Sequence, residues 1–127
     1  MATATTVTRT RGAATVVVWT LSILCAAMFL FAGGSKLAGQ AAMVQVFQAI
    51  GVGQWFRYLT GMIEVTSAAL LFVPPLAFYG ALALAVTMVG AIITHLFIIG
   101  GNPLVPVLLL AATSTIAYLR RPNPSNL

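Results

Sequence analysis

Long runs of apolar residues, separated by short clusters of glycine, proline and polar residues, make up most of the chain. Inside the runs, apolar residues follow one another without period-two alternation, which is typical of membrane-spanning helices and not of barrel strands. A spanning helix needs about 20 apolar residues, and the chain has room for four. The runs predict spans at about residues 13–35, 55–73, 78–99 and 104–119.

A shorter stretch, residues 40–50, has a different pattern. Met43, Phe47 and Ile50 recur at helical spacing, and glutamines occupy positions off this stripe. The pattern predicts a short helix in the membrane interface, ended by Gly51. The predicted fold class is therefore all-α: an integral membrane four-helix bundle with a short interfacial helix between spans one and two.

Punctuating residues set the remaining boundaries. Pro74 and Pro75 are expected to stop the second span and to leave a tight connection to a third span that begins at Phe78. We expect flexible tails at 1–12 and 120–127, outside the transmembrane domain 13–119.

Small residues recur at four-residue steps in the third span. Ala83, Thr87 and Ala91 form this ridge, and His95 continues it. Small side chains allow helices to approach closely in membranes. We expect the ridge to face the interior of the bundle.

Composition agrees with the membrane assignment. The chain is 61% hydrophobic and 6% charged, whereas a soluble domain has about a quarter charged residues. A water-soluble globule is excluded, and the lipid bilayer is the expected partner. The six Lys and Arg residues are scattered and not interleaved with aromatic residues, so nucleic-acid binding is rejected. Cys25 is the single cysteine, which excludes a disulfide relay within one chain.

Arginines flank the predicted bundle on one side. Arg9 and Arg11 precede span one, and Arg120 and Arg121 follow span four. Basic residues concentrate on the cytoplasmic side of membrane proteins. We therefore predict that both termini are cytoplasmic.

Four ionisable residues fall in the other half of the predicted bundle: Lys36, Arg57, Glu64 and His95. At 1.5 Å per residue, Glu64 lies roughly 13 Å and His95 roughly 6 Å below the outer interface. A charge in hydrocarbon costs at least about 2.5 kcal/mol, so such residues face the interior and pair. We expect the four to converge on one site.

The predicted cluster has a net charge. Arg57 and Glu64 are seven residues apart on one helix face, and the long Lys36 side chain can extend toward Glu64, which would keep the carboxylate ionised. With His95 neutral the sum is +1, which favours an anion or a quinone carbonyl. His95 could donate a hydrogen bond or relay a proton. Thr94 and Tyr58 are further candidate ligand-binding or proton-relay residues.

Other interpretations stand beside ligand binding. The Lys–Glu pair can instead lock two spans together in a scaffolding subunit without chemistry of its own. A small transporter is a third hypothesis, although Glu64 beside two cations is a poor site for organic cations. One His and one Glu are too few for a closed zinc site, so no metal is predicted. The chain has no Asp, so no Ser-His-Asp set can form.

Three short elements resemble the DoxX-like family of small four-span membrane proteins (the DoxX/DoxD superfamily). They are Phe31-Ala-Gly-Gly-Ser-Lys36-Leu37 at the end of span one, Gly61-Met-Ile-Glu64 in span two, and Gly90-Ala-Ile-Ile-Thr-His95 in span three. Their order and spacing cover about residues 20–119.

The resemblance implies a four-helix membrane bundle. Relatives are linked to quinone-coupled sulfur oxidation, as the thiosulfate:quinone oxidoreductase membrane subunit, and to membrane oxidoreductase complexes in mycobacteria. The leading hypothesis is a redox-associated subunit that binds a quinone or another small lipophilic or anionic ligand; any enzymatic activity would be that of a quinone-linked oxidoreductase subunit. The candidate protein partners are an oxidoreductase and further copies of the same chain in a homo-oligomer. The expected location is a prokaryotic cytoplasmic membrane.

Overall fold

The computed structural model describes residues 2–122, and within them every regular element is a helix. The all-α prediction is confirmed, and the predicted short helix is present between the first and second long helices. The elements are α1 (Ala2–Ala38), α2 (Ala41–Ile50), α3 (Gln54–Leu70), α4 (Pro74–Thr94), the π-helix η1 (His95–Ile99) and α5 (Leu104–Arg120).

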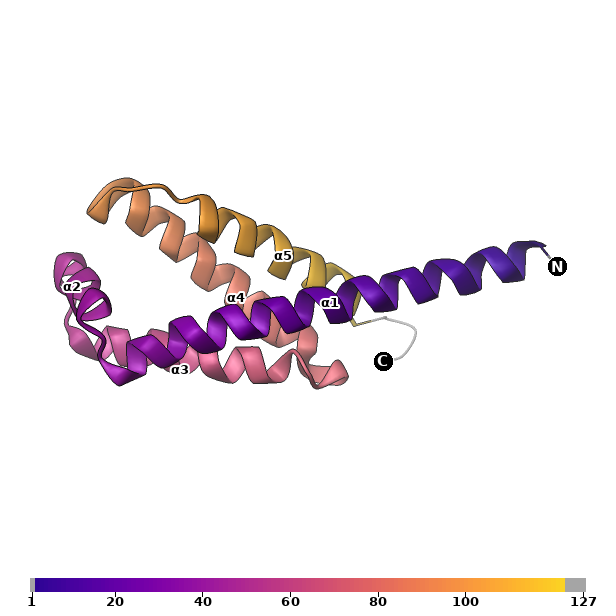
Figure 1. Ribbon diagram of the computed structural model, residues 1–127, viewed down its shortest axis with the longest axis horizontal. Coiled ribbons are helices and arrows are strands. Elements are labelled where there is room, and N and C mark those ends of the chain that lie inside the picture. Colours follow the sequence, from indigo (N-terminus) through magenta and orange to yellow (C-terminus); the bar gives the residue numbers. More distant parts are fainter. Residues whose placement is uncertain (1, 123–127) are drawn as a thin grey trace.

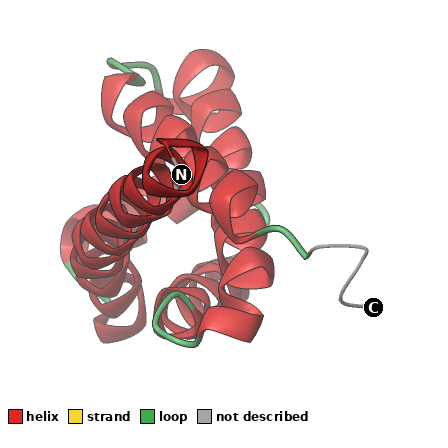
Figure 2. Ribbon diagram, turned by 90° about the vertical axis from the view of Figure 1, so that its right-hand side faces the viewer, coloured by secondary structure: helices red, strands yellow, loops and turns green. Residues whose placement is uncertain are grey.

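The long helices form two antiparallel pairs that diverge along the molecule (Figure 1). α1 packs on α3, α4 packs on α5, and α3 packs on α4, while α1 also contacts α5. The pairs lie close together at the end where α3 meets α4, and they separate toward the end that holds α2 and η1 (Figure 1). Seen along the bundle, the helices are arranged around a common axis (Figure 2).

The hydrophobic core lies in the part of the bundle where the pairs are close. All four long helices contribute to it, because each directs one apolar stripe inward. The cluster of buried residues is Val18, Cys25, Ala26, Phe29, Ala68, Leu71, Ala81, Leu84, Met88, Ile116 and Ala117. This core holds one end of the bundle together and leaves the other end free to enclose a site.

The first helix is longer than predicted. It begins at Ala2, so the boundary predicted at residue 13 lies inside α1. It also continues through Gly33 and Gly34 and ends before Gly39, whose positive φ of 72° a helix cannot accommodate. At the other end of the chain, most of the predicted C-terminal tail, residues 123–127, lies outside the described residues.

The two prolines after α3 begin a helix, contrary to the prediction that they would form a connection. α4 starts at Pro74, and Pro74 and Pro75 occupy its first turn. The first N–H groups of a helix have no intrahelical acceptor, so proline loses nothing there. The turn is made instead by Leu71–Val73.

The ridge predicted on the third span is half-buried and is not the most deeply buried face of α4, although Ala91 packs against the hydrophobic core. The buried face of α4 is formed by Ala77, Gly80, Ala81, Leu84, Ala85 and Met88. Gly80 makes the close approach, because an added Cβ would lie 2.7 Å from the Ser67 carbonyl oxygen. Thr87, Ala91 and His95 line a cavity instead.

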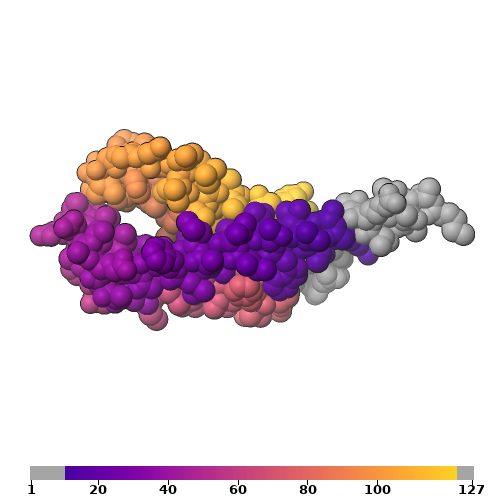
Figure 3. Space-filling view, in the orientation of Figure 1, coloured from indigo at the N-terminus to yellow at the C-terminus, as the bar shows by residue number. Residues whose placement is uncertain are grey.

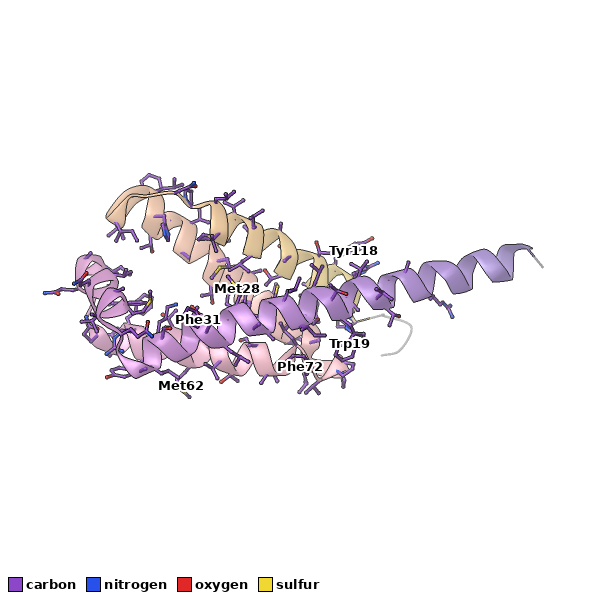
Figure 4. All side chains as sticks on the ribbon, in the orientation of Figure 1. Trp19, Met28, Phe31, Met62, Phe72 and Tyr118 are labelled. Carbon is purple, nitrogen blue, oxygen red and sulfur yellow. The ribbon has the colours of Figure 1, made fainter. Side chains whose placement is uncertain are left out.

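In the part of the chain that the structure describes, two helices are long and apolar enough to cross a membrane, at Arg11–Ala38 and Pro74–Ile99. α5 is apolar but shorter, and α3 carries Arg57 and Glu64. Large apolar side chains also cover the outer surface, such as Phe31, Met62 and Phe72, which are labelled in Figure 4. An apolar exterior of this extent fits a lipid environment.

Candidate functional site

A cavity of about 420 Å³ lies at the end where the helix pairs separate. The opening is visible between α2 and the orange region of η1 and α5 (Figure 3). Most of the wall is apolar, and a few polar side chains converge on it. The lining residues are Lys36, Met43, Val46, Phe47, Ile50, Phe56, Thr60, Ile63, Glu64, Val86, Thr87, Met88, Gly90, Ala91, Thr94, His95 and Ile99.

One wall of the cavity carries an ion pair between α1 and α3. The Lys36 ammonium lies 2.9 Å from Oε1 and 3.2 Å from Oε2 of Glu64. The Glu64 side chain is 2% exposed and the Lys36 side chain 14%. A charge this deeply buried needs a partner, and Lys36 is the partner that neutralises the carboxylate.

Two glycines bring this pair together. Each lies three residues before one member of the pair, Gly33 before Lys36 and Gly61 before Glu64. An added Cβ would lie 2.9 Å from the facing carbonyl oxygen at Gly33 and 3.0 Å at Gly61. The backbones of α1 and α3 therefore cross in contact. Because the two helices are antiparallel, Glu64 lies beside Gly33 and Lys36 lies beside Gly61, and the long Lys36 side chain spans the distance between them.

His95 occupies the facing wall, at the start of η1. Its Nδ1 lies 2.9 Å from the carbonyl oxygen of Ala91. Single π-helical turns inside α-helices occur frequently at functional sites. Here the π-helical turn follows α4 directly and ends at Gly100, whose φ is 73°.

Three threonines complete the polar part of the lining. The hydroxyls of Thr60, Thr87 and Thr94 donate to the carbonyls of Phe56, Ala83 and Gly90, at 2.8, 2.8 and 2.9 Å. Thr94 was among the predicted site residues. Thr60 and Thr87 were not, although Thr60 lies four residues before Glu64 and Thr87 lies eight residues before His95 on the predicted ridge.

Arg57 lies behind the site and outside the cavity lining. Its guanidinium donates to the backbone carbonyl of Lys36 and, at 2.7 Å, to Oε1 of Gln54, and it lies 4.3 Å from the centre of the Tyr58 ring. The Gln54 amide in turn donates to the Val44 carbonyl on α2, at 3.1 Å. We call Arg57, Gln54 and the Val44 carbonyl the α2 latch, because they tie α1 and α3 to α2.

The structure therefore brings together only part of the predicted cluster. Lys36, Glu64, His95 and Thr94 line one cavity. Arg57 and Tyr58 do not, because the carbonyl of Lys36 and Oε1 of Gln54 bind the guanidinium near the start of α3, two turns before Glu64. Tyr58 is half exposed. Removing Arg57 from the charge count leaves Lys36 against Glu64, and the predicted sum of +1 becomes zero.

The α2 latch makes a testable prediction. In Gln54→Leu the Val44 carbonyl loses its side-chain donor and Arg57 loses an acceptor. One net hydrogen bond is worth about 1 kcal/mol, so amide hydrogen exchange in α2 should accelerate about fivefold. Mass spectrometry of exchanged peptides measures this. Gln48→Leu, an exposed glutamine on α2, is the matched control and should leave exchange unchanged. Equal exchange in both variants would contradict the latch.

Within residues 2–122 no three side chains of His, Cys, Asp or Glu gather into a group that could hold a metal. A model of the DoxX-like family matches residues 20–117, which include every polar residue of the cavity. No curated protein and no solved structure matches the chain.

Proposed function

This chain belongs to the DoxX-like family. We propose that it is a redox-associated membrane subunit whose cavity binds a neutral lipophilic ring compound such as a quinone. The family membership and the two long apolar helices indicate a membrane protein. The observation that carries the proposal is the buried Lys36–Glu64 pair on the wall of an otherwise apolar cavity.

The charge balance supports a neutral ligand. Lys36 and Glu64 cancel, and Arg57 is outside the cavity, so an anion would meet no net attraction there. The apolar wall, which includes Phe47 and Met88, suits a ring and a short tail. A volume of about 420 Å³ lies within the usual range of small-molecule sites. One remaining N–H of Lys36 could donate to a ring oxygen.

The placement in the membrane is part of the proposal. We propose four spans, α1, α3, α4 and α5, with α2 in the outer interface. α1 begins and α5 ends at the same end of the bundle (Figure 1). Arg120 lies at that end, opposite the cavity, so the positive-inside rule supports cytoplasmic termini and a cavity in the outer half of a prokaryotic cytoplasmic membrane. A partner oxidoreductase would supply or accept the electrons.

Binding can be tested by filling the cavity. Gly90 lines it, and an added Cβ there meets nothing within 4 Å. Purified protein should yield a quinone on lipid extraction. A quinone analogue at about 100 times its Kd should stabilise the protein by about 2.7 kcal/mol, measured as a rise in Tm. Gly90→Phe should abolish this rise, because the new ring occupies the ligand's place.

The control uses a second open glycine. Gly34 also has free space at its Cβ and does not line the cavity, so Gly34→Phe should keep the response. A protein that carries no extractable quinone and does not respond to the analogue would contradict the proposal. That outcome would favour the scaffolding role, in which the ion pair only joins α1 to α3.

A further inference from the structure

The hydrogen bond of His95 fixes which ring nitrogen carries a proton. A carbonyl oxygen can only accept, so the Nδ1 that lies 2.9 Å from the Ala91 oxygen must donate. In an uncharged imidazole the other nitrogen then has a lone pair and no hydrogen. His95 therefore presents Nε2 as a hydrogen-bond acceptor, and no residue of the described chain donates to it.

The threonines of the cavity are acceptors for the same reason. Each hydroxyl has one hydrogen, and in Thr60, Thr87 and Thr94 it is directed to a carbonyl one turn earlier. Their oxygens retain lone pairs and have no donor left. The membrane-embedded hydroxyls thus add acceptor capacity to the wall without adding donor capacity.

The ion pair adds one more acceptor and, among the described side chains that line the cavity, the only free donor. The Glu64 carboxylate accepts only, and Lys36 directs N–H groups to both of its oxygens. An ammonium has three N–H groups, so one remains for a ligand. The free polar groups of the cavity are therefore one donor, on Lys36, and several acceptors.

We propose that the cavity recognises a hydroxyl-bearing ring, a hydroquinone or phenol, in preference to the corresponding quinone. This inference rests on the proposed function. A hydroquinone can accept from Lys36 at one oxygen and donate its other O–H to Nε2 of His95. A quinone offers only acceptors, so its second carbonyl would face the lone pair of His95 with no hydrogen between them. An unmatched buried polar group is costly, and this cost sets the preference.

Binding of matched ligand pairs tests the preference. We would titrate the full-length protein in detergent by calorimetry under anaerobic conditions. The ligands are 1,4-naphthoquinone and 1,4-dihydroxynaphthalene. A second, redox-inert pair, 1-methoxynaphthalene and 1-naphthol, separates hydrogen bonding from reduction of the protein. In each pair the hydroxyl compound should bind about tenfold more tightly.

Variants locate the preference in named groups. His95→Leu removes the acceptor and should reduce the tenfold ratio to about twofold or less. Thr87→Val keeps the shape of the side chain, removes one acceptor and should reduce the ratio by a smaller factor. Thr115→Val is the matched control: Thr115 makes the same bond to the carbonyl four residues earlier, on α5, and does not line the cavity. Its ratio should equal that of the unmodified protein.

The outcomes separate this inference from the proposed function. Failure of all four ligands to bind would contradict the proposed function itself. Equal affinities within each pair, or tighter binding of the quinone, would overturn the hydroxyl preference while leaving a lipophile-binding cavity intact. A preference that persists unchanged in both His95→Leu and Thr87→Val would also overturn it, because the acceptors named here would then not be its source.

Discussion

Lys36→Met should destabilise the protein by about 3–5 kcal/mol, which is the usual cost of leaving one member of a buried ion pair without its partner. Glu64 is 1% exposed, and Lys36 is its single salt-bridge partner among the described residues. Arg57 cannot replace Lys36, because its guanidinium is bound to the Lys36 carbonyl and to Gln54, two turns before Glu64 on α3. The measurement is thermal unfolding in detergent, followed by the circular dichroism of the helices.

A double variant identifies the cause. Lys36→Met with Glu64→Leu removes both charges and keeps apolar volume, so it should be more stable than Lys36→Met alone. The double-mutant cycle should give a coupling energy of a few kcal/mol, because the two side chains are in direct contact. Strictly additive losses would show that the pair does not stabilise the bundle as an ion pair. The double variant should also lose the ligand response, because the donor of the cavity is gone.

The second large effect is expected at the crossing of α1 and α3. Gly33→Ala should destabilise the protein by about 1–3 kcal/mol, although alanine is the better helix former. The new Cβ would lie 2.8 Å from Cγ2 of Val65 and 2.9 Å from the Gly61 carbonyl oxygen. The Val65 side chain can rotate, but a backbone oxygen in a helix cannot, so α1 and α3 must separate. The Lys36–Glu64 distance should then increase.

The neighbouring glycine is the control for this prediction. Gly34→Ala lies in the same helix and meets nothing within 4 Å. It should be neutral or stabilise by up to about 1 kcal/mol, because alanine restricts the unfolded chain and favours the helix. Thermal unfolding of the two variants side by side measures the difference. Equal stabilisation by both substitutions would show that the helices do not cross in backbone contact at Gly33.

These effects bear on both explanations of the ion pair. A scaffolding protein and a ligand-binding protein would both be destabilised by Lys36→Met. Only in a ligand-binding protein should Gly90→Phe abolish a rise in Tm caused by a quinone analogue. This substitution leaves the ion pair intact and fills the cavity beside it. Stability measurements therefore test the geometry of the crossing of α1 and α3, and the change in Tm on adding a ligand tests whether the cavity binds one.

Much of this protein was predictable from its sequence. Continuous apolar runs predict helices because a helix satisfies its own backbone hydrogen bonds, and the observed helices lie where the runs do. The elements around Lys36, Glu64 and His95 carried the resemblance that the family match confirms. These three residues were also candidates on energetic grounds, because charged and polar groups in an apolar segment need an interior environment.

The sequence could not show that Lys36 reaches Glu64. Arg57 lies seven residues away on the same helix, roughly 10 Å along its axis, and two turns of separation are too long for a direct pair. Lys36 is distant in the chain, and it reaches Glu64 only because Gly33 and Gly61 let two backbones touch. The structure also places Arg57 outside the cavity lining, so the predicted net charge of +1 becomes zero. The favoured ligand is therefore neutral and not an anion.

The sequence alone determined the helices, the family and four polar residues that line the cavity, because hydrophobic periodicity and the cost of burying polar groups act along each segment. Only the tertiary structure decided that Arg57 belongs to the α2 latch, that Pro74 begins a helix, and that the polar groups of the cavity are mostly acceptors. These depend on which backbone groups meet across helices, and such contacts are set by the packing of the whole bundle.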